Sequence, residues 1–248
     1  RARDGGYELH TIPADVVKAF QSIPHFAVED ALRRLGLPEE AVSLMMATNY
    51  GEGEEGEALL ATCQVITSAG LSPSFEVENG ILQGMRCSPG RCLAFFDLLL
   101  TFLDEAGAKG ITVEVEGREI NTPAFAFADD LWLGAYSARD LQHTLSLVSQ
   151  FLGLYGVRLH PKKSYYVPVN VKPPDREEEV GLWQEEGGQR KFTPLPRVAP
   201  DEACRYLGIW LQADGGWDTM AQVVKDKVTG WTRAVVKHKL PLHNAVMA

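Results

Sequence analysis

Residues 124 to 135 read AFAFADDLWLGA, an apolar stretch interrupted only by Asp129 and Asp130. The pattern predicts two strands, 124–127 and 131–135, joined as a hairpin with both acids at a tight turn. Two adjacent carboxylates in an apolar strand are costly, because each loses solvation and the two repel each other. A divalent cation offsets both costs, since carboxylate oxygens are ligands of hard cations. This stretch therefore predicts a metal site at the end of a hairpin.

Asp15 can supply a third carboxylate to such a site. Residues 7 to 17 predict a strand that runs into a turn, and Pro13 within it favours an edge position in a sheet or an early end to pairing. If this strand lies beside the hairpin, three acids meet at one edge, and such a cluster suits two Mg²⁺ ions that activate a hydroxyl and stabilise a leaving phosphate. The alternative is a polar hairpin turn with Asp15 as a cap, because a lone Asp-Asp pair is weak evidence for metal chemistry.

Helices and further strands are predicted on both sides of the hairpin. A long buried helix is expected to begin at Ser88, as a capping residue followed by Pro89, and another at the capping box of Ser137 and Asp140. Two shorter helices are expected on either side of Gly36. The other expected elements are a hairpin around Glu116-Gly117, a short strand pair around Gly187-Gly188, a strand over 206–211 and a helix from there to Ala248.

Composition indicates a globular chain. Of the 248 residues 45% are hydrophobic and 23% charged, and no apolar run approaches the length of a membrane span. The chain starts at Arg1 without a basic, apolar leader, so we expect no signal peptide and a beginning inside a longer protein. Its four cysteines are too far apart for a CxxC pair, which favours reduced thiols inside the cell. The net charge of -9 disfavours nucleic-acid binding by bulk electrostatics, unless basic parts lie elsewhere.

Five motifs, in the same order, resemble polymerase motifs of reverse transcriptases. They are Asp15-Val-Val-Lys18-Ala-Phe20, Gln83-Gly84 with Ser88-Pro89, Phe127-Ala-Asp129-Asp130, Gly156-Val157 with Lys163-Ser164, and Tyr206-Leu207-Gly208-Ile209. The Ser22-Ile-Pro-His25 continuation and the Tyr-Leu-Gly form resemble the non-LTR (LINE-like) branch. The resemblance runs from about Leu9 to the C-terminus, and five ordered motifs are more specific than any one.

The resemblance implies an α+β fold, the polymerase palm, in which helices cover one face of a ferredoxin-like antiparallel sheet. Residues 1–166 are expected to form the palm core with part of the fingers at about 26–80, residues 167–200 an insertion or loop, and residues 201–248 the primer-grip hairpin and the start of a thumb. The implied activity is RNA-directed DNA polymerisation, in which a primer 3′-hydroxyl attacks a dNTP.

By the same resemblance, Asp15, Asp129 and Asp130 hold two Mg²⁺ ions, which Mn²⁺ can replace, and the Val16 carbonyl joins the metal shell. The nucleotide-binding residues are Val16, Lys18, Phe20, Gln83 and Gly84, and the ring of Phe20 excludes a ribose 2′-hydroxyl. Leu207 and Gly208 position the primer. Lys163 is a candidate proton donor to pyrophosphate, with Lys162 an almost equal choice. The alternative roles are a core aromatic for Phe20, plain loop and hairpin residues, and solvated surface lysines.

Gln21 and Met85-Arg86-Cys87 depart from the family pattern without removing a metal ligand. The expected fingers motifs would precede Arg1, so we expect the isolated chain to polymerise poorly. Expected partners are an RNA template, a DNA primer, a dNTP and the remaining domains of a parent polyprotein, with no membrane, inside the cell and in the nucleus. The competing hypotheses are an intron-encoded or cellular reverse transcriptase and a catalytically silent, palm-like RNA-binding or interaction scaffold.

Overall fold

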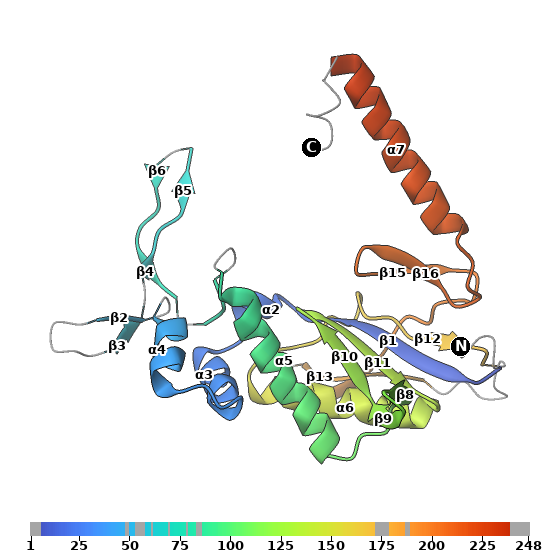
Figure 1. The fold of residues 1–248 in the computed structure, drawn as a ribbon, viewed down its shortest axis with the longest axis horizontal. Coiled ribbons are helices and arrows are strands. Elements are labelled where there is room, and N and C mark those ends of the chain that lie inside the picture. The colour runs from blue at the N-terminus through green and yellow to red at the C-terminus, as the bar shows by residue number, and fades with distance from the viewer. Residues whose placement is uncertain are drawn as a thin grey trace.

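A four-stranded antiparallel sheet forms the centre of the chain in the computed structural model (Figure 1). The structure describes residues 6–47, 50–52, 58–60, 62–68, 70–77, 79–82, 86–171, 179–186 and 189–238. The strand order is β10 (Ala124–Phe127), β11 (Asp130–Ala135), β1 (Leu9–Asp15) and β12 (Val167–Val169). The predicted hairpin and the strand ending at Asp15 are therefore neighbours in one sheet.

Alternation along β1 and β11 gives the sheet two different faces. Ile12, Leu131 and Leu133 are fully buried, and their side chains alternate with those of Pro13 and Trp132 on the other face. Helices α5 (Ser88–Glu105) and α6 (Ala138–Leu154) pack against β10 and β11 on the buried face. The core thus lies between the sheet and these two helices.

Aromatic side chains join the two helices. Phe95 of α5 lies 5.7 Å from Phe151 and 5.4 Å from Tyr155 of the α6 end, measured between ring centroids. Burying a phenylalanine of this kind stabilises a fold by roughly 1.5–3 kcal/mol. The cap predicted for α6 is present, since Ser137 Oγ accepts from the Asp140 backbone N–H at 3.1 Å and donates to the Asp140 carboxylate at 2.8 Å. It therefore fixes where α6 begins, directly after the sheet.

Of the two alternatives expected for Pro13, the early end to pairing is confirmed and the edge position is wrong, because β1 is an interior strand. β12 pairs with residues 9–11 of β1 only, so Pro13 lies beyond its end. The Pro13 carbonyl accepts from the Tyr165 N–H on that side, at 3.2 Å, and the N–H that proline lacks would face the same way. A proline fits here because the neighbouring strand has already ended.

Ser88 is not the capping residue of α5. It is the first helical residue, Cys87 stands at the N-cap, and the Ser88 hydroxyl donates to the Leu82 carbonyl instead. The hydroxyl therefore ties the helix to the preceding segment, and Pro89 occupies the first turn as expected.

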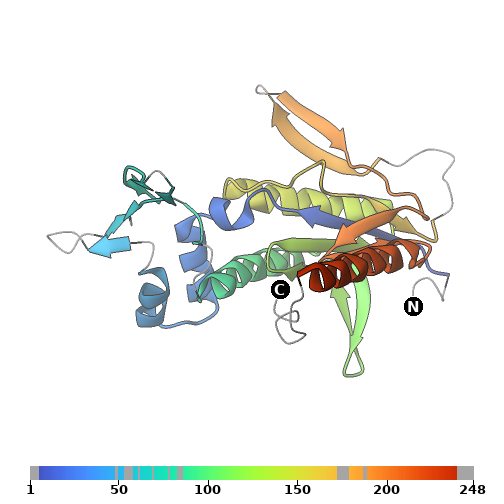
Figure 2. The ribbon, with the colours of Figure 1, turned by 90° about the horizontal axis from the view of Figure 1, so that it is seen from above.

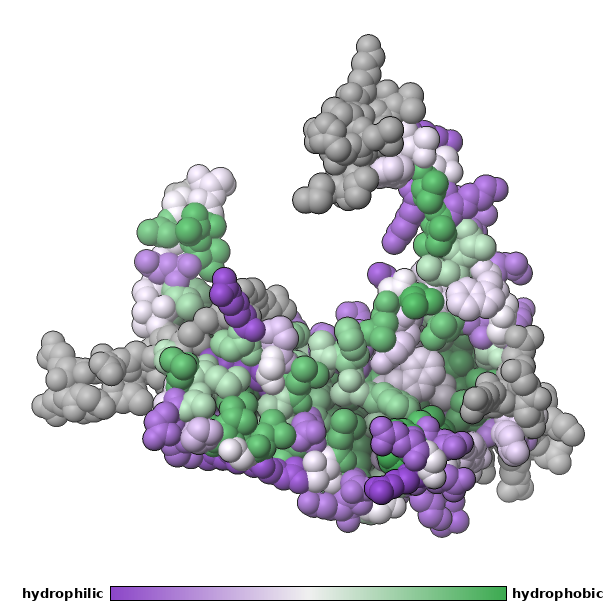
Figure 3. Space-filling view, viewed as in Figure 1, coloured by the Kyte–Doolittle hydropathy of each residue, from purple (hydrophilic) through white to green (hydrophobic). Residues whose placement is uncertain are grey.

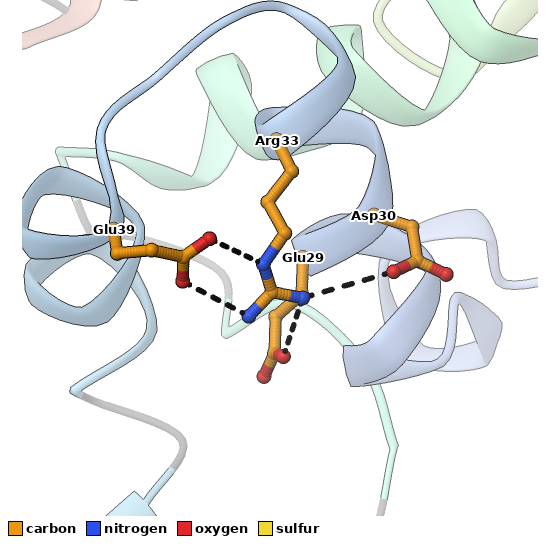
Figure 4. Close-up of polar contacts among 4 residues, drawn as sticks. All are labelled: Glu29, Asp30, Arg33 and Glu39. Carbon is orange, nitrogen blue, oxygen red and sulfur yellow. Dashed lines mark hydrogen bonds and ion pairs between the residues drawn. The ribbon is translucent and has the colours of Figure 1, made fainter.

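The remaining elements extend from this core. Helices α2 (Ala19–Ser22), α3 (His25–Arg34) and α4 (Glu39–Met46) follow β1, and α3 packs on α5. Arg33 joins α3 to α4 through Glu39, with its Nε 2.9 Å from the carboxylate, and also contacts Glu29 and Asp30 (Figure 4). This network lies at the surface, where solvent screens it.

Short strands and one long helix make up the rest. Six strands form the first arm: β2 (Tyr50–Glu52), β3 (Ala58–Leu60), β4 (Thr62–Cys63), β5 (Ile66–Thr67), β6 (Gly70–Leu71) and β7 (Phe75–Glu76). Three hairpins follow: β8 (Ile111–Val115) with β9 (Arg118–Thr122), β13 (Gly181–Glu186) with β14 (Gln189–Pro194), and β15 (Ala203–Tyr206) with β16 (Ile209–Gln212). Helix α7 (Asp218–His238) comes last, and Figure 3 shows the surface hollowed between it and the first arm.

The predicted α+β class, an antiparallel sheet with helices on one face, is confirmed. The strand predicted over 206–211 is wrong, because a turn at Leu207-Gly208 divides it into β15 and β16. The division into palm, insertion and thumb stays a prediction, and β12 at its boundary belongs to the central sheet. Among the described helices, none is both long and apolar enough to cross a membrane.

Candidate active site

Three carboxylates share one end of the central sheet. Asp15 is the last residue of β1 and lies opposite Asp130, the first residue of β11. Asp129 precedes it in the turn from β10, where Ala128 has a left-handed backbone with φ of 54°. Asp130 is thus a strand residue rather than part of the turn, which corrects the predicted placement. The register of β1 against β11 brings together acids that are more than 110 positions apart in the chain.

The charges of these acids act on different neighbours. Burial raises the pKa of Asp130, and the negative charges of Asp129 and Asp15 raise it further. Burial raises the pKa of the Cys92 thiol in α5 to about 12, with a contribution from Asp129. Burial also raises the pKa of Tyr206 in β15, with a contribution from Asp130. The charge of Asp129 therefore acts on a thiol of α5, and the charge of Asp130 on a phenol of the β15–β16 hairpin.

Lys163 is the cation that the structure brings to this cluster. Its Nζ lies 3.8 Å from Asp15 Oδ2, and its side chain is 62% exposed. Lys162 is also exposed and forms no ion pair with the described residues. The geometry favours Lys163 over Lys162 as the lysine next to the acids.

Backbone hydrogen bonds hold the Lys163 segment against β1. The Val17 N–H donates to the Arg158 carbonyl and the His160 N–H donates to the Asp15 carbonyl, both at 2.8 Å. Ser164 Oγ accepts from the Asp15 N–H at 3.2 Å. The predicted motif of Lys163-Ser164 is thus next to the predicted motif that begins at Asp15.

Within the part of the chain that the structure describes, no group of three or more His, Cys, Asp or Glu side chains is arranged to hold a metal ion. The three aspartates share one end of the sheet, with Asp129 in the turn, and Asp15 is paired with Lys163. Their donor chemistry still fits a hard divalent cation, because all three offer carboxylate oxygens.

The residues after Asp15 follow the sheet end closely. Val16 is buried and forms a β-bridge with Leu159. Asp15 and Val17 form backbone hydrogen bonds to the 158–160 segment, so the Val16 carbonyl points to the opposite side, towards β11. Lys18 has a left-handed backbone with φ of 48° and caps α2. Phe20 is half-buried and packs against the core, so part of its ring serves packing.

Gln83 and Gly84 lie outside the described residues. The Ser22-Ile-Pro-His25 motif holds the segment just before them. His25 is buried, and its Nε2 lies 3.0 Å from the Gly80 carbonyl oxygen. The Gly80 N–H in turn donates to the Ile23 carbonyl. Gly80 has φ of 100°, and a Cβ there would lie 2.9 Å from the Gln21 backbone. The motif thus has a structural role in docking the 79–82 segment.

Leu207 and Gly208 form the turn between β15 and β16, with φ of 49° and 78°. Directly before them, the ring of Tyr206 meets the ring of Trp132 at 4.8 Å between centroids. The sequence does not indicate Trp132 as part of the site, because it reads as an ordinary apolar residue of its strand. The aromatic Tyr206 in the Tyr-Leu-Gly motif was the available signal.

The chain matches a family model described as reverse transcriptase (RNA-dependent DNA polymerase), over residues 2–211. It belongs to the reverse transcriptase family. This finding agrees with the five ordered motifs, and the predicted non-LTR type of reverse transcriptase domain is confirmed by the curated relatives.

Those relatives come from retrotransposable elements. The reverse transcriptase domain is 30% identical over 202 residues to the retrovirus-related Pol polyprotein from type-2 retrotransposable element R2DM of Drosophila melanogaster, covering 81% of this chain and 17% of the relative. It is 31% identical over 160 residues to the Pol polyprotein from type-1 retrotransposable element R2 of Popillia japonica, covering 64% of this chain and 21% of that one. The chain therefore spans about a fifth of the length of these relatives.

Among solved structures, the domain is similar to apo telomerase from Candida tropicalis. The TM-score is 0.43 at 13% sequence identity, and the match covers 83% of this chain and 31% of the telomerase chain.

Proposed function

We propose that this chain is the catalytic part of an RNA-directed DNA polymerase that joins a dNTP to a primer 3′-hydroxyl. The observation that carries the proposal is the pairing of Asp15 with Asp130 in the β1–β11 register, with Asp129 beside them. The negative charges of these acids repel one another, so bringing them together does not stabilise the sheet by itself. A role in binding a cation explains why the fold places them side by side.

Two divalent ions, Mg²⁺ or its substitute Mn²⁺, would be held by Asp15, Asp129, Asp130 and the Val16 carbonyl. When bound, such ions activate the attacking hydroxyl and stabilise the charge on the leaving pyrophosphate. Asp15 would exchange its contact with Lys163 for the cation, which explains how the carboxylates could gather. Carboxylates and a backbone carbonyl are the oxygen donors that these cations prefer.

Lys163 would then serve the leaving group. Its ammonium group lies next to the acids and is well exposed, so it can reach a bound triphosphate and donate a proton to the departing pyrophosphate. Phe20, five positions after Asp15, would exclude a ribose 2′-hydroxyl with the exposed part of its ring, and Lys18 would contact the incoming nucleotide. Leu207 and Gly208 would hold the primer, because their turn comes from a hairpin whose Tyr206 contacts the sheet face beside Asp130.

The nucleic acid would lie in the hollow between the first arm and α7 (Figure 3). The chain carries a net charge of -9, so affinity for an RNA template and DNA primer would come in large part from other domains of a parent polyprotein. The relatives' far greater length supports such a parent. We propose the nucleus as the place of action, which localisation of the tagged parent protein would test.

Primer extension on matched RNA and DNA templates in Mg²⁺ tests this function, using the parent protein and its Asp129→Asn variant. We expect extension on RNA that the substitution abolishes. A folded, template-bound protein that extends neither template would instead support the silent scaffold, and equal activity of the Asp129→Asn variant would place the chemistry elsewhere.

A further inference from the structure

The face of the sheet that carries Asp130 also carries Trp132. The two residues are separated by one position in β11, so their side chains project to the same side. This is the face opposite the one covered by α5 and α6, and Pro13 of β1 lies across from Trp132 on it. A contact to Trp132 is therefore a contact to the acid-bearing face, two residues along β11 from Asp130.

The β15–β16 hairpin makes that contact at its tip. Tyr206 is the last residue of β15, pairs with Ile209, and directly precedes the Leu207-Gly208 turn. Its ring meets that of Trp132 edge to face, at 4.8 Å and an interplanar angle of 74°. This is the favoured geometry for two aromatic rings.

The base of the hairpin is anchored separately. Cys204 is buried with Val167 of β12 and Val198, and the half-buried Leu211 packs against them. Gln212 donates from Nε2 to the Asp201 carbonyl at 2.9 Å. With the base fixed near β12, the position of the tip relative to Asp130 depends on the Tyr206–Trp132 contact.

We propose that Tyr206 and Trp132 are positioning residues that fix the Leu207-Gly208 turn, and hence a primer end, at a set place relative to Asp130. This inference rests on the proposed function. Burial raises the pKa of Tyr206, and the negative charge of Asp130 raises it further, in keeping with the contact to Trp132. The ring carries the positioning role, because it is the ring that contacts Trp132.

Kinetic measurements on variants of the parent protein separate this role from general stability. An aromatic pair contributes a factor of roughly twofold to tenfold in an equilibrium. We expect Tyr206→Ala and Trp132→Ala each to raise the KM for primer by about that factor, with little change in the KM for dNTP. Tyr206→Phe keeps the ring and should restore the primer KM. The double alanine variant should be no worse than either single one, since both remove the same contact.

Trp183→Ala is the matched control. Trp183 is also a half-exposed aromatic residue in a hairpin, and its ring contacts Phe192 at 5.2 Å between centroids, within the β13–β14 hairpin rather than on the sheet. Its replacement should leave the primer KM unchanged. An unchanged primer KM in Tyr206→Ala, or additive losses in the double variant, would overturn the proposed role.

Hydrogen exchange on the 248-residue chain tests the contact without any activity. We expect Trp132→Ala to speed amide exchange in residues 205–210, and Trp183→Ala to leave those residues unchanged. If Trp132→Ala exchanges faster but the parent protein extends no primer, the proposed function and the primer role are wrong, while the Tyr206–Trp132 contact is confirmed. Unchanged exchange in Trp132→Ala would overturn the contact as the anchor of the tip, whatever the enzyme does.

Discussion

Two successive hairpins carry acids near their turns, but their surroundings differ. Glu114, Glu116 and Glu119 of β8–β9 are exposed on a two-stranded sheet that projects from the body (Figure 2). Asp129 and Asp130 of β10–β11 are half-buried, because β11 also pairs with β1 and thereby meets Asp15. Both turns contain a left-handed residue that is not glycine, Glu116 and Ala128. A third strand in register, rather than the acids or the turn, therefore makes the candidate metal site.

The largest effect should separate the acids of the two hairpins. Asp130→Asn should lower the rate of primer extension by about a thousandfold or more. It removes a carboxylate that would hold the divalent ions, and these ions stabilise the charge of the transition state. Glu119→Gln should leave the rate within about twofold, since Glu119 is exposed on β9. Steady-state extension rates of both variants provide the check, and equal losses would remove the distinction between the hairpins.

The next effect concerns the cation beside the acids. Lys163→Gln should lower kcat by about a hundredfold if Lys163 donates the proton to pyrophosphate. Lys162→Gln is the matched control, because Lys162 is adjacent and exposed, and it should change kcat little. A larger loss in Lys162→Gln than in Lys163→Gln would reverse the assignment.

A smaller effect should appear in stability measured in EDTA. The raised pKa of Asp130 means that the folded state binds a proton more readily than the unfolded state, so this carboxylate destabilises the fold once both states have lost the proton. Stability should therefore rise as the pH falls through the raised pKa of Asp130, until the ordinary value of 3.8 is reached and the unfolded state is protonated too.

Asp130→Asn should accordingly raise the Tm at pH 7 by a few degrees, on the order of 2–4 °C, and flatten this pH dependence. Glu116→Gln should do neither, because Glu116 is exposed. Thermal unfolding of the two variants in EDTA decides the matter, and a lower Tm for Asp130→Asn would show that the acids do not repel one another in the fold.

The smallest effect should come from the turns themselves. A residue other than glycine in the left-handed conformation costs about 1 kcal/mol, which a glycine there removes. Part of that gain is lost, because glycine also increases the conformational entropy of the unfolded chain. Ala128→Gly and Glu116→Gly should therefore each stabilise the chain by only about 0.5 kcal/mol. Urea unfolding should show similar gains for both, since the two turns share this strain. A marked difference would mean that one turn is held by its surroundings.

Local patterns predicted the elements around the site well. The alternation in residues 124–135 predicted the hairpin, and Ser137 with Asp140 predicted the start of α6, because both depend on neighbouring residues alone. The meeting of Asp15 with Asp130 was also predicted, although it required the further assumption that β1 lies beside the hairpin.

Features set by distant contacts were not predictable in the same way. Pro13 predicted either an edge strand or an early end to pairing, and only the fold decides between them, because β12 ends before reaching it. The Ser88 hydroxyl bonds to Leu82 rather than capping α5. The contact between Trp132 and Tyr206 joins residues 74 positions apart, and neither shows it in its local pattern. Each depends on tertiary packing that overrides a local preference.

Mn²⁺ binding to the 248-residue chain, followed by electron paramagnetic resonance, shows whether Asp15 and Asp130 form a metal site. We expect wild type and Glu119→Gln to bind Mn²⁺ equally, and Asp15→Asn and Asp130→Asn, each folded, to bind it at least about tenfold more weakly. Equal binding by all four proteins would contradict the claim that the β1–β11 register builds a metal site.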